Sequence, residues 1–545
     1  LMGHLGWRLQ VGQLIGLIAG RPYFNINTAI ALLRRLPFIT PEQLGRIFGG
    51  AQEHLGRFGH IQFTPADLPR LPFSLGQVVC GVPRITPALA RFTLFPGHEC
   101  FDPARLFNDA ADRMAPEHRA DEQLLRAIHH DLSPVEIGLS PAMRYMGIGA
   151  AYFVALHILC ERWFGAEGPA IAGRLIAGLG TLNPAETGRE LWHLAELANR
   201  DAQLRRAVGE ETSFAALTKR LSATEAGETF LTRWRSFMLR HGHHGRGEVE
   251  LMNPRWNETP DVVLALTRNY LEALANHHTC ASMQMDDLAR QRAVQTEACL
   301  RRLRNPFQRA LFRWTLRRAQ RGLAIKENFK STFVRRLSVA RLLALELGQS
   351  LVQRGRCAHR DDIFFLTLEE LRPDFLFNGK PDLRKIVSAR RAEYERNRHL
   401  KPPPVVFGMG DPAQWSSESA ESAETLFGDH LEGVPVSPGL ATGRARVILE
   451  VSPRDRVLPG EILVAPLTDP GWSPYFLTAA GLVIDLGGML SHGSILAREY
   501  GIPAVVNVGA ATRTIRTGDL VQVDGERGRV TILERAGPFP TEARK

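Results

Sequence analysis

Apolar residues recur at three- and four-residue spacing through most of the first 425 positions, a pattern typical of amphipathic helices. Clear helices are predicted at 122–129, 142–164, 170–179, 185–199, 225–241, 261–318 with breaks, 331–354 and 383–398. The apolar run over 5–20 is expected to join the same body, and 59–103 reads as loops. Residues 361–366 read as a short strand that enters a helix capped by Thr367. The pattern thus predicts a large, mainly α-helical domain over 1–407.

Beyond residue 430 the periodicity changes to short apolar or alternating runs. These predict strands at 443–449, 461–465, 482–485, 504–506, 520–523 and 529–532, the last two joined as a hairpin. A small sandwich of sheet and helices is therefore expected over 430–535. The intervening stretch 408–429 is poor in apolar residues and rich in Ser, Glu and Ala, which favours a flexible linker over an immobile spacer.

The most distinctive chemistry lies in the stretch 487–499. A buried strand at 481–485 leads into a glycine turn, and the helix that follows is stopped by Gly501 and Pro503. His492 therefore stands at or just before a helix N-terminus, where free N–H groups and the helix dipole would stabilise a phosphate on the imidazole. The alternative is a histidine that only caps or packs the helix.

Four motifs in this region carry a resemblance to a known family. The segments 433–439, 463–474, 487–499 and 501–506, in this order, resemble the mobile phosphohistidine domain of phosphoenolpyruvate (PEP)-utilising enzymes, which include pyruvate phosphate dikinase, PEP synthase and rifampicin phosphotransferase. The resemblance covers about 431–533 and implies a swivelling β/β/α domain in which His492 accepts a phosphoryl group. Many members have Thr where this chain has Leu490. The phosphate loop implied by the resemblance consists of Thr468, Gly487, Gly488, Ser491 and Gly493.

A second block lies in the helical part, from His241 to Trp256. It is similar to a glycine-rich block of rifampicin phosphotransferases and PEP synthase-like proteins, and this implies a substrate-binding domain in which Arg246 and Glu248 orient the ligand. A purely structural turn is the alternative for either residue. The three histidines of the block match no standard helical zinc spacing, so no metal site is predicted.

Lys326 and Lys330 are four residues apart and share one helix face. Their segment resembles the family block that presents basic residues to the phosphohistidine, where members often carry Arg-Glu-x-x-Lys. Lys326 supplies a point charge in place of the bidentate guanidinium. Two cations would stabilise a migrating phosphoryl group, whereas the alternative is a solvated basic face.

Composition narrows the class of protein. The chain has 545 residues and a net charge of +10, which fits either an Arg-rich solvated surface or attraction to anionic ligands. No nucleic-acid-binding motif is present. Six cysteines without a C-x-x-C pair favour a reducing, cytoplasmic location. The apolar run 146–160 is too short to span a membrane, so no membrane partner is expected.

Neither a G-x-x-x-x-G-K-[ST] loop nor an ATP-grasp pattern occurs in the chain. ATP and Mg²⁺ are therefore expected on a missing or separate ATP-grasp domain, which is the predicted protein partner. The predicted function is a dikinase-type phosphotransferase that passes phosphate from ATP through His492 to an acceptor in the helical domain, such as a rifampicin-like antibiotic. The alternatives are a PEP synthase-like half-enzyme that acts on pyruvate, and a non-catalytic module that binds a hydrophobic ligand or regulates a partner.

Overall fold

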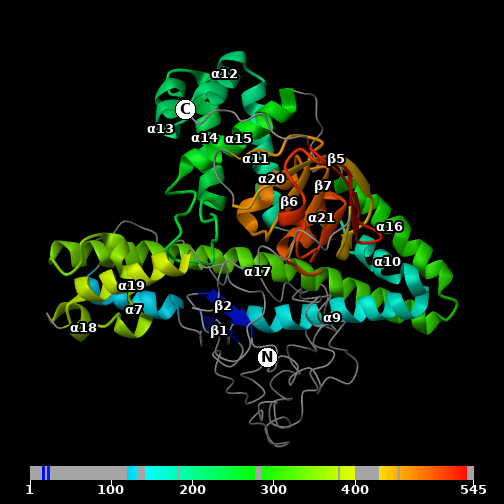
Figure 1. The fold of residues 1–545 in the computed structure, drawn as a ribbon, viewed down its shortest axis with the longest axis horizontal. Helices are drawn as coiled ribbons and strands as arrows, with labels where there is room; N and C mark the ends of the chain where they lie inside the picture. The colour runs from blue at the N-terminus through cyan, green and yellow to red at the C-terminus, as the bar shows by residue number, and fades with distance from the viewer. Residues whose placement is uncertain are drawn as a thin grey trace, which may run out of the picture.

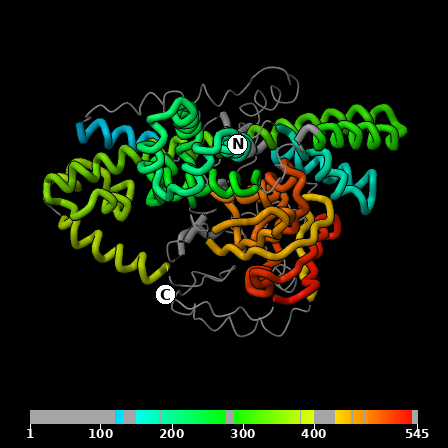
Figure 2. The backbone as a smooth tube through the Cα atoms, turned by 90° about the horizontal axis from the view of Figure 1, so that it is seen from above, coloured from blue at the N-terminus to red at the C-terminus, as the bar shows by residue number. Residues whose placement is uncertain are grey.

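The computed structural model describes residues 15–18, 21–24, 120–132, 141–180, 183–275, 285–378, 381–398, 429–450 and 455–536. The chain forms a helix-rich body followed by a C-terminal sheet domain (Figure 1). Viewed from above, the sheet domain lies beside the middle of the body (Figure 2). The predicted linker, apart from residue 429, falls outside the described residues, as do the predicted loops at 59–103.

The body consists of helices with short 3₁₀ turns between them. These are α7 (Asp121–Leu132), α9 (Pro141–Phe164), α10 (Gly168–Leu175), α11 (Asn183–Asn199), α12 (Ala202–Glu210), α13 (Phe214–Leu221), α14 (Glu225–His241), α15 (Pro260–Ala275), α16 (Met285–Arg302), α17 (Pro306–Gln353), α18 (Pro373–Phe377) and α19 (Leu383–Arg398). The predicted helices at 225–241 and 383–398 are confirmed to the residue. No helix of the described residues combines the length and apolarity that crossing a bilayer requires.

Three sequence predictions are wrong in this part. Residues 15–18 form strand β1 (Ile15–Ile18), paired with β2 (Arg21–Phe24), and not part of a helix. Instead of a strand, residues 360–365 form the 3₁₀ helix η5 (Arg360–Phe365), because Asp362 caps it by accepting from the backbone N–H of Ala358 and His359. The predicted break between 318 and 331 is absent, since both positions lie within α17, a single helix of 48 residues.

The helix α17 runs through the body alongside α9 (Figure 1). The two helices touch where Gly149 meets Gly322, because a Cβ atom on Gly149 would lie 2.4 Å from the Cα atom of Gly322. Only glycine permits such a close approach of two backbones. This contact lies one helical turn before Lys326, so it sets the distance of that turn from its neighbours.

The C-terminal domain contains an eight-stranded mixed sheet with strand order β3-β10-β9-β5-β6-β7-β8-β4. The strands are β3 (His430–Glu432), β4 (Val434–Ser437), β5 (Leu440–Val447), β6 (Ile462–Ala465), β7 (Gly481–Ile484), β8 (Ala504–Val506), β9 (Leu520–Asp524) and β10 (Arg529–Glu534). Strands β5 to β8 are parallel, so the loops after β6 and β7 meet at one edge of the sheet. Two helices, α20 (Ser473–Phe476) and α21 (His492–Tyr500), follow these loops.

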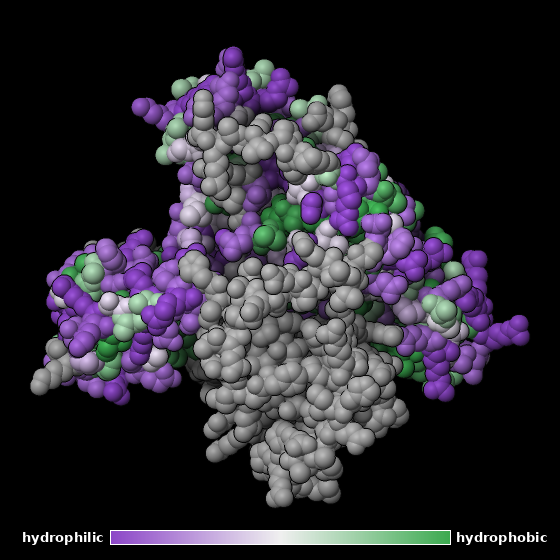
Figure 3. All heavy atoms as spheres, in the orientation of Figure 1, coloured by the Kyte–Doolittle hydropathy of each residue, from purple (hydrophilic) through white to green (hydrophobic). Residues whose placement is uncertain are grey.

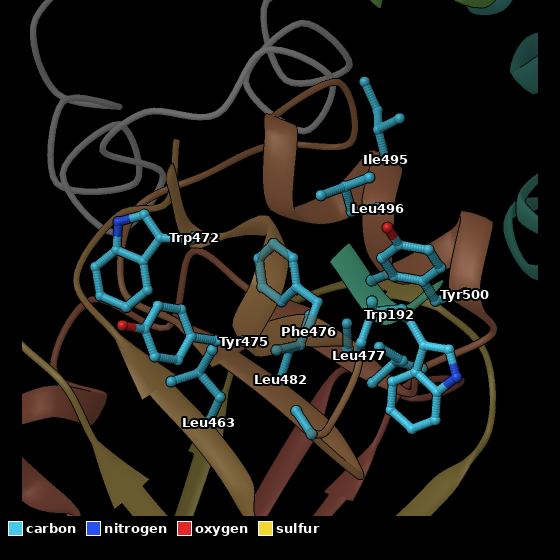
Figure 4. Close-up of a cluster of buried hydrophobic side chains, with 14 of the residues drawn as sticks. Trp192, Leu463, Trp472, Tyr475, Phe476, Leu477, Leu482, Ile495, Leu496 and Tyr500 are labelled. Atoms are coloured by element: carbon cyan, nitrogen blue, oxygen red, sulfur yellow. The ribbon is translucent and has the colours of Figure 1, made fainter. Parts of the chain in front are cut away.

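An apolar seam joins the two domains, and we define it by Gly188 and Trp192 of α11 and by Leu477 and Tyr500 of the sheet domain. All four belong to or border one buried cluster that extends through both domains (Figure 4). A Cβ atom on Gly188 would lie 2.9 Å from Tyr500 Oη and 3.0 Å from Leu477 Cδ1. On the face drawn in Figure 3, hydrophilic side chains cover the outer ends of the helical body, in contrast to this buried seam.

Candidate active site around His492

His492 is the first residue of α21 and directly follows the loop after β7. Ser491, in extended backbone conformation, precedes the helix, and Gly501 ends it in the left-handed region at φ 68°. The prediction that His492 stands at or just before a helix N-terminus is confirmed. Gly493 packs on the neighbouring loop, because a Cβ atom there would lie 2.5 Å from Thr468 Oγ1. The histidine is thus held where two loops of the sheet edge meet.

The imidazole of His492 lies between the two domains, and its side chain is 4% exposed. Ser473 Oγ lies 3.2 Å from its Nε2 atom, within the sheet domain. On the other side Nδ1 lies 3.6 Å from Glu327 Oε2 of α17. Burial lowers the pKa of His492 more than Glu327 raises it, so the ring is neutral near pH 7. A neutral imidazole is a competent nucleophile.

Lys326 contacts the histidine loop directly. Its Nζ atom donates to Leu490 O and to Glu327 Oε1, both at 2.8 Å. Lys330 lies one turn further along α17 and is close enough to lower the pKa values of His492 and Glu327. The structure therefore brings both predicted lysines to the predicted histidine.

Glu327, which stands between these lysines in the sequence, was not singled out by the sequence analysis. It is 1% exposed, and Oε2 has no hydrogen-bond partner. Burial alone would raise the pKa of Glu327, but Lys326, His492 and Lys330 hold it well below its ordinary value. The sequence feature that could have identified Glu327 is a carboxylate next to Lys326, in a helix turn with apolar neighbours.

The structure places the two predicted substrate residues, Glu248 and Arg246, in different environments. Glu248 is buried, accepts from His244 Nδ1 at 2.8 Å and is close enough to His492 to affect its pKa. Arg246 instead pairs with Glu450 at 2.7 Å, with the two side chains 55% and 71% exposed. The structure therefore places Glu248 near the histidine and Arg246 on the surface.

The loop that carries Glu248 also touches the loop after β6. The backbone N–H of Gly247 donates to Asp469 Oδ2 at 2.9 Å, and Gly471 N–H donates to Oδ1 at 2.8 Å. Burial raises the pKa of Asp469, and Glu248 adds to the rise. Like Ser473, Asp469 belongs to a motif quoted for the family resemblance, although neither was chosen as a site residue.

Hydrogen bonds fix the glycine turn before His492. Ser491 N–H donates to Gly488 O at 2.9 Å, and Ser494 Oγ donates to the same oxygen at 2.7 Å. Beneath the turn, buried Arg498 donates to the carbonyls of Val436 and Met489. Gly487 approaches Ser491 closely, since its Cβ position lies 3.0 Å from Ser491 Oγ. These hydrogen bonds therefore hold the turn that precedes His492 in one conformation.

No group of three His, Cys, Asp or Glu side chains spaced for a metal ion occurs in the described ranges. Of the carboxylates near His492, Glu327 and Glu248 each have one oxygen bound, to Lys326 and His244 respectively, and both oxygens of Asp469 accept from backbone N–H groups.

Comparison with known proteins finds a family match in each of the two domains. Residues 141–327 match the rifampicin phosphotransferase fourth domain, and residues 457–528 match the mobile domain of PEP-utilising enzymes.

Individual relatives match over longer stretches. The prodigiosin synthesizing transferase PigC of Serratia marcescens is 30% identical over 396 residues, 70% of this chain and 42% of that protein. Rifampicin phosphotransferases of Streptomyces sviceus and Bacillus subtilis are 33% and 31% identical, over 55% and 54% of this chain and 34% of each relative. The chain spans less than half the length of these relatives. The chain therefore contains a helical region similar to a domain of rifampicin phosphotransferases, followed by a region that matches the mobile domain of PEP-utilising enzymes.

Proposed function

We propose that this chain is the phosphohistidine carrier and acceptor-binding part of a dikinase-type phosphotransferase. The observation that supports it best is the position of His492, a neutral imidazole at a helix N-terminus that faces Lys326, Glu327 and Lys330 of the helical body. The phosphoryl group would come from ATP on a separate ATP-grasp domain, pass to His492 and then to an acceptor at the body.

Each residue of the site has a part in this proposal. His492 attacks phosphorus with the lone pair of Nε2, and Ser473 orients the ring from its own domain. Lys326 and Lys330 stabilise the charge of the transferring group, as cations do in phosphoryl transfer. Glu248 is buried with one carboxylate oxygen unpaired, and takes the proton of the acceptor hydroxyl.

Because the imidazole is 4% exposed when docked, this arrangement cannot itself receive phosphate from a large donor domain. The sheet domain therefore leaves the body to be phosphorylated and returns to deliver the group. The composition of 408–429, poor in apolar residues, is the basis on which we expect a linker that permits this movement.

The acceptor we propose is a hydroxyl of an apolar natural product, as in a rifampicin-like antibiotic. Two relatives named rifampicin phosphotransferase support this class. A surface groove of about 820 Å³ between α11 and α14 is lined by charged side chains such as Glu196, Arg200, Glu228 and Arg233. It matches such an acceptor poorly, so we place the acceptor beside Glu248 instead.

The match to a prodigiosin synthesizing transferase favours a second candidate, in which phosphorylation activates an acceptor for a synthetic step. In that case the final product contains no phosphate. Mass spectrometry of products formed from candidate acceptors distinguishes the two, since a stable phosphate ester supports simple phosphoryl transfer.

The direct test is labelling of His492. The chain is incubated with [γ-³²P] and [β-³²P]ATP and an ATP-grasp domain of a related phosphotransferase, and separately with phosphoramidate, which phosphorylates accessible histidines chemically, and the phosphorylated residue is identified by peptide mass spectrometry. We expect an ATP-derived, acid-labile, base-stable label on the peptide that contains His492, which His492→Ala abolishes and His193→Ala, an exposed control, retains. An ATP-derived label that survives in full in His492→Ala, or no phosphate on His492 with either donor, contradicts the proposal.

A further inference from the structure

Two buried, unpaired atoms face each other across the domain boundary. His492 Nδ1 and Glu327 Oε2 lie 3.6 Å apart, and neither has a hydrogen-bond partner. Both side chains are almost completely buried, at 4% and 1% exposure. Buried polar atoms normally have a partner, so this pair is set to form a hydrogen bond after a small shift of the docked domain.

The contacts favour one tautomer of His492. A carboxylate can only accept hydrogen bonds, so the tautomer with its hydrogen on Nδ1, opposite Glu327, suits this position best. Ser473 Oγ, 3.2 Å from Nε2, then donates to the lone pair of that nitrogen. The reactive lone pair is therefore on Nε2. The group that faces the proton on Nδ1 is Glu327 of the helical body, and not a residue of the sheet domain to which His492 belongs.

We infer that Glu327 is a positioning residue that keeps Nδ1 of phosphorylated His492 protonated at the body, so that the ring leaves as neutral imidazole. This rests on the proposed function. The acceptor oxygen attacks phosphorus, the P–Nε2 bond breaks and its electron pair returns to Nε2. The proton on Nδ1 stays on the ring, and the acceptor proton moves to Glu248. Without the carboxylate, the ring loses that proton more readily and becomes an imidazolate leaving group, which is far poorer.

The other charged groups around the ring act in known directions. Lys330 opposes ring protonation, whereas Glu248 favours it, as does Glu327. Lys326 binds the second oxygen of Glu327 and holds the carboxylate in place. Asp469 faces the same ring from the loop after β6 and is influenced by it. Among these groups, Glu327 is the one the structure places opposite Nδ1.

The first test measures the ring itself and needs no catalysis. Deuterium exchange at imidazole Cε1, followed by mass spectrometry across a pH series, gives the pKa of each histidine in the full chain. We expect Glu327→Gln to lower the pKa of His492, Glu327→Asp to preserve most of it, and Glu346→Gln, a control on the same helix, to leave it unchanged. An unchanged pKa in Glu327→Gln overturns the inference, and an unchanged exchange curve for His157 shows that the variant is folded.

The second test separates the two proposals. The chain is phosphorylated with phosphoramidate, and transfer from His492 to a candidate acceptor or to water is followed by the loss of phosphate from the peptide that contains His492, measured by mass spectrometry. We expect Glu327→Gln to accept the label normally but to release it about tenfold more slowly near pH 8, with a smaller difference near pH 6. Equal rates at both pH values overturn the role of Glu327 alone, whereas absence of any label on His492 contradicts the proposed function.

Discussion

The boundary between the two domains has two parts with different physical character. The apolar seam at Gly188, Trp192, Leu477 and Tyr500 is tightly packed and contains no ionic group in the contacts that define it. A few residues away, His492 lies among buried charges. Apolar contact depends on shape alone, whereas the charged part depends on protonation state and, under the proposed function, on phosphorylation of His492. The residues that hold the two domains together thus differ from the residues whose charge state can change.

The largest expected effect comes from the apolar seam. Leu477→Ala removes a side chain that is 4% exposed, and we expect a loss of about 3 kcal/mol in the free energy of unfolding. Urea denaturation measures it, and Leu533→Ala, at a residue 50% exposed, serves as the control, with a change within about 0.5 kcal/mol. Equal losses in the two variants would show that the seam is not packed as described.

The next effect concerns the ionic part. Lys326→Met leaves Glu327 buried without its cation, and we expect a loss of about 2 kcal/mol at pH 7. The pKa of Glu327 is lowered in the folded state, so its stabilising contribution exists above its ordinary pKa of 4.5 and disappears as the pH falls. Because the variant raises that pKa, its acid unfolding should begin at a higher pH. A variant with unchanged acid unfolding would contradict this account.

A third prediction concerns His157 of α9, which is buried and lies close enough to Arg498 of α21 to feel its charge. Burial lowers the pKa of His157 to about 3, so the unfolded chain binds a proton below pH 6.5 that the native state does not bind. Stability is complete above pH 6.5 and declines below it. We expect His157→Leu to remove about 2 kcal/mol of the loss between pH 7.5 and 5, measured by denaturation at both values. Parallel pH profiles for the variant and the parent chain would argue against a buried neutral ring.

The smallest effect is expected at Arg246. Its ion pair with Glu450 is exposed, so Arg246→Ala should change stability by no more than about 0.5 kcal/mol, and less at high salt. We also expect the KM for the acceptor to stay unchanged, since the side chain lies away from His492. A large rise in KM would restore the substrate-binding role that the sequence suggested.

The sequence could predict much of this arrangement, for physical reasons that differ between elements. The helix 225–241 was found to the residue because Thr224 accepts from Gly227 N–H at its start and the apolar spacing is regular. The break expected between 318 and 331 is wrong, because packing against α9 keeps α17 continuous there. Local periodicity cannot show that a distant helix covers such a stretch.

The site shows the same limit. His492, Lys326 and Lys330 could be chosen as candidates from local motifs, because each motif is continuous in sequence. The significance of Glu327 could not, since it depends on Nδ1 of a residue 165 positions later, at 3.6 Å. The different environments of Arg246 and Glu248, only two residues apart, likewise depend on tertiary contacts, since Glu248 is buried against His244 whereas Arg246 forms an exposed ion pair with Glu450 of the sheet domain.

The glycine contact between α9 and α17 has a consequence for how the molecule moves. Gly149 and Gly322 bring two backbones together one turn before Lys326, so the contact serves as a fixed pivot for the turn that meets the carrier. At about 1.5 Å per residue, the 48 residues of α17 form a rod of roughly 70 Å. A slight tilt about that pivot, begun at the far end near α7, would displace Glu327 relative to the imidazole ring. Under the proposed function, a force applied to the distant end of α17 would then influence phosphoryl transfer from His492 without contacting Nε2 or the phosphorus atom.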